Sequence, residues 1–136
     1  ITLHAPYTKE NHHMFNKETF ARVKPGAVFI NTARGQLVDT AALVQALESG
    51  KLSGAGLDVL EGEELIKEKG IVQKYRKLSA KQKNQLALAN RLLHNENVVF
   101  TPHIAFYSKE AVHRILEVTS ENIQAYLKGR PINLIN

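Results

Sequence analysis

The sequence contains no cysteine and no tryptophan, and it has only one methionine and four prolines. The absence of cysteine excludes a disulfide framework and metal sites built from thiolates, and six scattered histidines do not replace them. A continuous run of about 18 apolar residues is missing, as is the pattern of a signal peptide. We therefore expect no membrane span and a cytoplasmic protein.

Acidic residues are fewer than basic ones, since 13 Asp and Glu stand against 18 Lys and Arg, for a formal net charge of +5. Such a balance raises the question of nucleic-acid binding. Most of the excess lies in residues 61–97, where Tyr75 is the only aromatic residue, so the interleaved aromatics of a single-strand platform are missing. We interpret this segment as a solvent-facing helical surface and expect no nucleic-acid partner.

The 136 residues, 43% of them hydrophobic, suffice for a domain with a buried core. Short apolar runs alternate with helical patterns, which predicts an α/β fold with a parallel sheet and right-handed crossovers. The run at 27–30 is typical of a strand covered on both faces. Strands are predicted at residues 1–3, 27–30, 54–60 and 98–101, and helices at 17–23 after Asn16, from Asp39 to Gly50, and from Ser108 to Gly129.

Polar residues follow the ends of these predicted strands. Arg34 comes directly after the strand at 27–30, and Asp58 and His103 end the next two strands. Because the carboxyl ends of parallel strands face one edge, these groups should converge, and Glu63 can fold back over that edge. Taken singly, each is more simply a loop or surface residue. Together, an arginine, a carboxylate and a histidine can bind an acid, orient an imidazole and move a proton.

A second histidine feature is the adjacent pair His12 and His13. Two histidines could indicate a metal site, but adjacent helical positions point about 100° apart and no carboxylate partner is evident. We therefore assign both residues to the surface and predict no metal site.

Three motifs occur in order: Asn-Thr-Ala-Arg-Gly at 31–35, Gly-Leu-Asp-Val-Leu-Glu-Gly-Glu at 56–63 and Thr-Pro-His-Ile-Ala at 101–105. Together they resemble the D-isomer-specific 2-hydroxyacid dehydrogenases, over nearly the whole chain. Phe106 makes the last motif look more like the D-lactate dehydrogenase branch, since a small residue usually stands there in the glycerate and phosphoglycerate branches. The resemblance implies an NAD-dependent enzyme that interconverts pyruvate and D-lactate by hydride transfer.

The resemblance also implies roles for individual residues. Arg34 would clamp the substrate carboxylate, His103 would exchange a proton with the substrate oxygen, and Glu63 would hold the imidazole and favour its charged form. Phe106 would shape the pocket for the substrate side chain, with Tyr107 as a second candidate for that pocket.

Other residues would contact the cofactor, NAD. Asp58 would accept a hydrogen bond from the nicotinamide carboxamide. The remaining cofactor-binding residues follow the first two predicted strands and are Ala5, Pro6, Asn11, Thr32, Ala33 and Arg34. The resemblance further implies a small 2-oxo or 2-hydroxy acid as the reaction partner and a homodimer of the full-length enzyme.

The phosphate-binding turn of this family, G-x-G-x-x-G with an acidic residue about 20 positions further on, does not occur in the sequence. We therefore expect residues 1–107 to be the second half of a doubly wound, Rossmann-like dinucleotide-binding domain, with residues 64–97 as a polar, partly helical insertion. Residues 108–136 would form a C-terminal helix and tail that return to the substrate domain.

The chain also opens directly on a predicted strand, so we expect it to be a C-terminal fragment, with the rest of the nucleotide site upstream of Ile1 and no activity on its own. The choice between NAD and NADP stays open at this point, because the discriminating acidic position is missing. The alternative function is a nucleotide-sensing regulator or corepressor on the same fold, and the set of Arg34, Glu63 and His103 argues against it.

Overall fold

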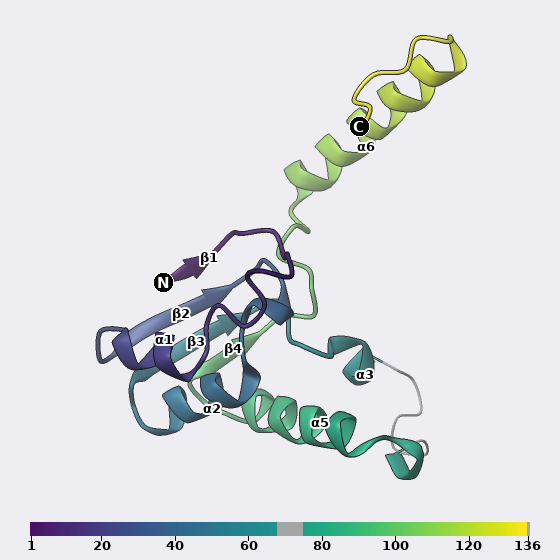
Figure 1. Cartoon of the computed structure of the whole chain (residues 1–136). Coiled ribbons are helices and arrows are strands. Elements are labelled where there is room, and N and C mark those ends of the chain that lie inside the picture. Colours follow the sequence, from purple (N-terminus) through teal and green to yellow (C-terminus); the bar gives the residue numbers. More distant parts are fainter. Residues whose placement is uncertain (68–74, 136) are drawn as a thin grey trace. The chain divides into compact units, whose positions relative to one another are not determined.

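The computed structural model describes residues 1–67 and 75–135 (Figure 1). Residues 68–74, which belong to the predicted insertion, and residue 136 lie outside the described part. The chain divides into two compact units, Ile1–His103 and Ile104–Asn136, whereas the sequence placed the boundary after residue 107. Among the described residues, no helix combines the length and the apolar character needed to cross a membrane.

A four-stranded parallel sheet organises the first unit (Figure 1), and its strands follow one another in space in the order of the chain. The strands are β1 (Thr2–Leu3), β2 (Ala27–Asn31), β3 (Leu52–Leu57) and β4 (Val98–Phe100). Leu3 pairs with Asn31, Asn31 with Leu57, and Leu57 with Phe100. All four strands therefore end at one edge, and the predicted α/β fold with a parallel sheet is confirmed.

The third strand differs in its limits from the prediction of residues 54–60. It begins at Leu52 and ends at Leu57, so that Asp58 is the first residue beyond it. Val59 and Leu60, only 2% and 5% exposed, are buried in the connection that follows, which explains why their apolar pattern reads as strand.

Helices connect the strands and supply the other half of the core. They are α1 (Lys17–Arg22), α2 (Thr40–Glu48), α3 (Glu63–Lys67) and α5 (Ala80–Leu93), with 3-10 turns η1 (Gly35–Leu37) and η2 (Tyr75–Lys77). Asn16 accepts from the N–H of Thr19 at 3.0 Å, which satisfies an otherwise unpaired N–H in the first turn of α1. Asp39 does the same for Ala41 and Ala42 at the start of α2. Both predicted caps are confirmed.

The core lies on the face of the sheet that carries Phe29. The ring of Phe29 is fully buried, and its centroid lies 5.0 Å from that of Phe15 and 5.3 Å from that of Phe20. Ala89 and Leu92 of α5 belong to the same cluster. The segment predicted to be a polar insertion therefore contributes part of the core through its one long helix.

The opposite face of β2 is half exposed. Val28 is 50% and Ile30 is 40% exposed, so the prediction of a strand covered on both faces is wrong for the described residues of this unit. The reason is that the core cluster gathers the helices on the side of Phe29. An apolar run is compatible with burial of both faces of a strand, but it does not show which elements of the chain pack on each face.

The second unit consists mainly of α6 (Lys109–Leu127). Ser108 caps it by accepting from the N–H of Ala111 at 3.1 Å, and Gly129, with φ +69°, follows its end. The predicted helix is confirmed. No residue of α6 is buried, and Leu116 and Ile123 are 63% and 56% exposed.

Candidate active site

Main-chain hydrogen bonds link three of the strand ends. The N–H of Asp58 donates to the carbonyl oxygen of Asn31 at 2.9 Å, and the N–H of His103 donates to the carbonyl oxygen of Asp58 at 2.8 Å. Asn31 at the end of β2, Asp58 directly after β3 and His103 three residues after β4 are therefore held next to one another by main-chain groups. Of the predicted polar strand ends, Asp58 and His103 are joined directly, and Asn31, three residues before Arg34, completes the series.

His103 has an unusual backbone for a residue with a side chain. Its φ is +61°, in the left-handed region, and its N–H also donates to the carbonyl oxygen of Thr101 at 2.9 Å. Non-glycine residues in this region carry strain and are concentrated at functional sites. The sequence contained no signal for this conformation.

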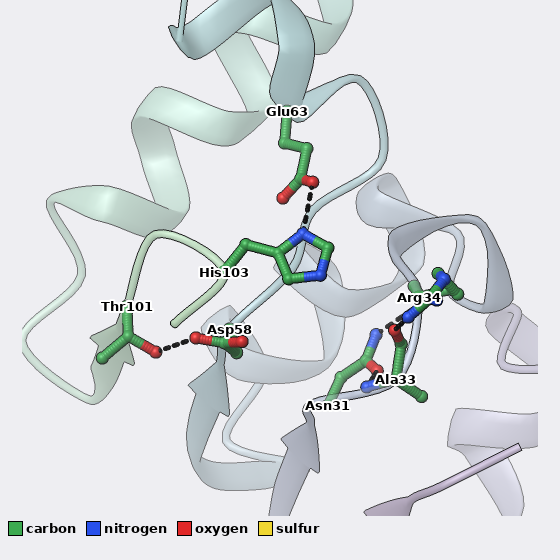
Figure 2. Close-up of polar contacts among 7 residues, drawn as sticks. All are labelled: Asn31, Ala33, Arg34, Asp58, Glu63, Thr101 and His103. Carbon is green, nitrogen blue, oxygen red and sulfur yellow. Dashed lines mark hydrogen bonds and ion pairs between the residues drawn. The ribbon is translucent and has the colours of Figure 1, made fainter. Parts of the chain in front are cut away.

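The imidazole of His103 is paired with Glu63. Nδ1 of His103 lies 2.8 Å from Oε1 of Glu63, and the two side chains are 38% and 21% exposed. With Glu63 ionised, Nδ1 carries a proton, so Nε2 is the nitrogen that can gain or lose one. Figure 2 shows Glu63 on one side of the ring and Arg34 on the side toward which Nε2 points.

Glu63 reaches this position through a glycine turn. Gly62 has φ +75°, a conformation that glycine adopts without strain, and the N–H of Glu63 donates to the carbonyl oxygen of Leu60 at 3.2 Å. The turn starts α3 at Glu63 and directs its carboxylate back over the sheet edge. This is the fold-back expected from the spacing to Asp58.

Asp58 is 3% exposed, and its Oδ1 accepts a hydrogen bond from the hydroxyl of Thr101 (Figure 2). Burial of a carboxylate is costly unless hydrogen bonds stabilise it, and Thr101 provides one. Thr101 had no predicted role, although it opens the motif at 101–105. Its position at the end of β4, two residues before His103, was the signal that could have found it.

The turn that carries Arg34 is organised by Asn31. The buried amide of Asn31, 1% exposed, accepts from the N–H of Ala33 and donates to the carbonyl oxygen of Arg34, both at 3.0 Å. The guanidinium of Arg34 is exposed, and its Nη1 donates to the carbonyl oxygen of Ala33 at 2.6 Å. The side chain is thus free of the core and still held at the edge of the sheet.

Gly35 joins this turn to the segment that carries Glu63. A Cβ atom at Gly35 would lie 2.2 Å from the carbonyl carbon of Leu60 and 2.4 Å from the nitrogen of Glu61. Only glycine allows this approach, because real Cβ atoms do not come so close to a backbone. The turns bearing Arg34 and Glu63 are therefore packed directly against each other.

The predicted cofactor residues near β1 lie in one loop. Asn11 donates from Nδ2 to the carbonyl oxygen of Pro6 at 2.7 Å, and its Oδ1 accepts from the N–H of Thr8 at 2.8 Å. Its amide therefore shapes the loop. Pro6 is exposed and Ala5 is half-buried.

Phe106 and Tyr107 belong to the second unit. They are 52% and 72% exposed, and their rings meet edge to face with centroids 6.0 Å apart. Their assignment to a substrate pocket stays a prediction.

The predicted divergence of His12 and His13 is wrong. The two residues lie in a turn and not in a helix, and their rings are stacked with centroids 3.8 Å apart. A carboxylate partner is present as well, since Nε2 of His13 lies 3.2 Å from Oε2 of Glu61. The spacing rule failed because it applies only to helical backbone.

The fold and the strand-end site together place the chain among α/β domains that bind a nucleotide at the carboxyl edge of a parallel sheet. Residues 1–105 match the sequence model of the D-isomer specific 2-hydroxyacid dehydrogenase, NAD binding domain. The chain therefore belongs to the D-2-hydroxyacid dehydrogenase family, and the cofactor of the domain that it matches is NAD. The family expected from the three motifs is confirmed.

Known proteins with similar sequences include several enzymes of 2-oxo and 2-hydroxy acids. An aromatic 2-oxoacid reductase of Clostridium sporogenes is 44% identical over 130 residues, which are 95% of this chain and 37% of the relative. A D-lactate dehydrogenase of Lactiplantibacillus plantarum is 39% identical, over 94% of this chain and 36% of the relative. The crystal structure of D-lactate dehydrogenase from Aquifex aeolicus complexed with NAD and lactic acid matches with a TM-score of 0.76 and 46% identity, over 95% of this chain and 37% of that one. The chain thus spans little more than a third of the length of these relatives.

The residues present fit the nicotinamide end of NAD. Asp58 offers a carboxylate acceptor at the end of β3, and a carboxamide NH₂ is a donor. Pro6 and Thr32, beside the ends of β1 and β2, are exposed, so ligand atoms can reach this edge. The sequence has no G-x-G-x-x-G turn, so the fit concerns the nicotinamide end and not the phosphates.

Proposed function

We propose that the protein carrying this chain is an NAD-dependent D-2-hydroxyacid dehydrogenase that interconverts pyruvate and D-lactate. The observation that carries the proposal is the 2.8 Å contact between Nδ1 of His103 and Oε1 of Glu63, at the same sheet edge as Arg34. A proton donor with its orienting carboxylate, beside a cation, is the arrangement that reduction of a 2-oxo acid requires.

Arg34 binds the carboxylate of the substrate. Its guanidinium presents five N–H donors in a planar fork, so it can engage both carboxylate oxygens while one N–H stays on the carbonyl oxygen of Ala33. Charge-assisted, bidentate hydrogen bonds fix the orientation of the acid. The same cation polarises the neighbouring carbonyl group.

His103 moves the proton. In the reducing direction its Nε2–H donates to the carbonyl oxygen of the substrate, which becomes the hydroxyl group, and in the oxidising direction neutral Nε2 accepts that proton. Glu63 keeps Nδ1 protonated in both states and stabilises the imidazolium. When bound, NAD accepts the hydride in oxidation, and NADH supplies it in reduction.

The cofactor contacts form a further part of the proposal. Asp58, held by Thr101, accepts from the carboxamide of the nicotinamide ring. Thr32, Ala33 and Arg34, of which Thr32 and Arg34 are exposed, line the nicotinamide, and the loop with Ala5, Pro6 and Asn11 borders it from the end of β1. Asn11 acts there by holding the loop shape through its bonds to Pro6 and Thr8.

The choice of substrate rests on Phe106 and Tyr107. A large aromatic at position 106 narrows the space for a substrate side chain, which favours the methyl group of pyruvate. The 44% identical aromatic 2-oxoacid reductase supports a bulkier 2-oxo acid as the second candidate. A pocket discriminates between such side chains by about 1–3 kcal/mol per methylene, so the two candidates should differ clearly in kcat/KM.

The experiment is a steady-state assay of the full-length protein with NADH and, in turn, pyruvate, phenylpyruvate and glyoxylate. We expect reduction of all three, with the highest kcat/KM for pyruvate and D-lactate as its product. A higher kcat/KM for phenylpyruvate than for pyruvate would contradict the proposed substrate, while the assignment as a 2-hydroxyacid dehydrogenase would stand. If no 2-oxo acid is reduced with NADH or NADPH, the proposed dehydrogenase activity is wrong, and a nucleotide-sensing regulator becomes the better assignment.

The expected location in the cytoplasm and the expected homodimer stay predictions, as does the role of α6. We propose that α6 docks its exposed apolar residues on the substrate domain of the full-length enzyme. Deletion of residues 108–136 from that enzyme should then raise KM for the 2-oxo acid and lower its melting temperature, whereas an unchanged enzyme would contradict this docking.

A further inference from the structure

A second polar cluster lies outside the residues assigned to catalysis. His12, His13 and Glu61 each offer one ligand atom, and these atoms all lie within 4.8 Å of one another. They border a cavity of about 180 Å³. In the described ranges, 1–67 and 75–135, this is the one group of three or more histidine, aspartate or glutamate side chains with such spacing.

The separations within the cluster suit a small metal ion. Zinc binds imidazole nitrogen and carboxylate oxygen at about 2.0–2.2 Å, so two ligands in a tetrahedral arrangement lie roughly 3.4 Å apart. Nε2 of His13 and Oε2 of Glu61 are 3.2 Å apart. His12 is exposed, so its ring can move the remaining short distance without disturbing the core.

The backbone already holds two of these ligands in place. His13 adopts φ +51°, and its N–H donates to the carbonyl oxygen of Gln36 at 2.9 Å. Glu61 is fixed from the other side, because its nitrogen packs against Gly35. The backbone of His13 is therefore strained in the conformation that places its ring beside a carboxylate. Such strain is concentrated at functional sites.

The histidine rings are also oriented. The rings of His12 and His13 are stacked at 3.8 Å with an interplanar angle of 23°. Nδ1 of His12 lies 3.5 Å from the hydroxyl of Tyr7, a contact at the outer limit of a hydrogen bond that leaves Nε2 of His12 for a ligand role. Second partners of this kind set the orientation of metal-binding histidines.

The rest of the cavity wall fits a cation as well. Asp39 and Glu61 contribute two carboxylates against the single ammonium of Lys81, and Asn84 and Gln85 of α5 bring amide groups to the same cavity. An amide oxygen or a water molecule can complete four-coordination. Two imidazoles and one carboxylate select zinc and related transition ions over Mg²⁺ and Ca²⁺, which prefer oxygen ligands alone.

We propose that His12, His13 and Glu61 form a binding site for a divalent transition ion, with Zn²⁺ as the best match. The bound ion ties the loop before α1 to the segment between β3 and α3. The site is distinct from the catalytic pair, since it uses Glu61 and leaves Glu63 with His103. Its role is structural, because it connects two loops that each border the proposed cofactor site.

The test is calorimetric titration of the protein with ZnCl₂, together with the visible absorption of Co²⁺ as a probe of coordination. We expect one Zn²⁺ per chain, an intense absorption band of four-coordinate Co²⁺, and no binding of Mg²⁺. H12Q and E61Q should each weaken Zn²⁺ binding more than tenfold and reduce the Co²⁺ band. His12 is exposed, so H12Q should fold normally, which its unchanged melting temperature without metal would verify.

Controls separate this site from other histidine and carboxylate pairs. His113 and Glu117 of α6 lie 3.2 Å apart without a third such ligand within the described cluster spacing, so H113Q should bind Zn²⁺ as the unmodified protein does. Zn²⁺ should raise the melting temperature of the protein and of H113Q but not that of H12Q. Equal affinity in H12Q and the unmodified protein, or loss of binding only in H103Q, would overturn the proposal.

Discussion

Nδ1 of His103 lies 2.8 Å from Oε1 of Glu63, although the two residues are 40 positions apart in the sequence. Neither side chain is deeply buried, since they are 38% and 21% exposed. The contact joins His103, three residues after the end of β4, to the first residue of α3. We therefore expect substitutions in either segment to alter kcat through this contact.

Glu63→Gln should lower kcat by about 100-fold, because the neutral amide no longer stabilises the imidazolium. If the amide turns its NH₂ group toward Nδ1, it also favours the tautomer in which Nδ1 is unprotonated. KM for NADH should change little, since Glu63 does not contact the cofactor in the proposed arrangement. Steady-state kinetics with pyruvate measure both. The matched control is Glu64→Gln at the exposed neighbouring position, which should be neutral, and an unchanged kcat in Glu63→Gln would speak against the assigned role.

Arg34→Lys should lower kcat/KM for the 2-oxo acid by about 10- to 150-fold, which corresponds to about 1.5–3 kcal/mol for a hydrogen bond to a charged group. Lysine keeps the charge but lacks the planar fork. Arg91→Lys is the control, because Arg91 is exposed and pairs with Glu48 on the helical surface. If both variants retain full kcat/KM, Arg34 does not clamp the substrate.

Asn31→Ala should destabilise the protein by about 2 kcal/mol, because the N–H of Ala33 loses its buried acceptor. It should also raise KM for the 2-oxo acid, since the turn that carries Arg34 loosens. Denaturant unfolding and steady-state kinetics check the two effects. Asn95 makes a similar bond to the N–H of Asn97 at an exposed site, so Asn95→Ala should cost less than about 1 kcal/mol.

Gly35→Ala should be strongly destabilising, by about 2–3 kcal/mol or more, because the added methyl group forces the backbone of Leu60 away. Gly56→Ala is the matched control within the same unit. A Cβ at Gly56 would meet Ile30 at 3.7 Å, an ordinary contact, so this change should be tolerated. Equal free energies of unfolding for the two variants would contradict the close approach at Gly35.

Much of this arrangement could be predicted from local chemistry. Asn16 and Asp39 start helices because their side chains accept from N–H groups that the helix cannot pair, and that rule needs only neighbouring residues. The shared strand edge followed from the order of strands and helices, which leaves few topologies for a parallel sheet. Arg34, Asp58 and His103 could therefore be assigned to one edge from the sequence alone.

The rest depended on contacts between distant residues. The stacking of His12 on His13 and the approach of Glu61 arise from a non-helical turn that is held by the carbonyl oxygen of Gln36. Nothing in the local sequence records that bond. For the same reason, the exposure of Val28 and the burial of Leu92 could not be predicted, because each depends on which elements pack on which face of the sheet.

The backbone ladder from Asn31 through Asp58 to His103 separates position from chemistry. Its hydrogen bonds use only main-chain groups, so the side chains of Asp58 and His103 take no part in the bonds that space the strand ends. In a duplicated or engineered copy of this domain, other acidic, basic or hydrogen-bonding side chains could therefore replace these ones while the backbone stays the same. Scaffolds of this kind diversify by exchanging functional groups on a constant frame, which is how one fold acquires many reactions.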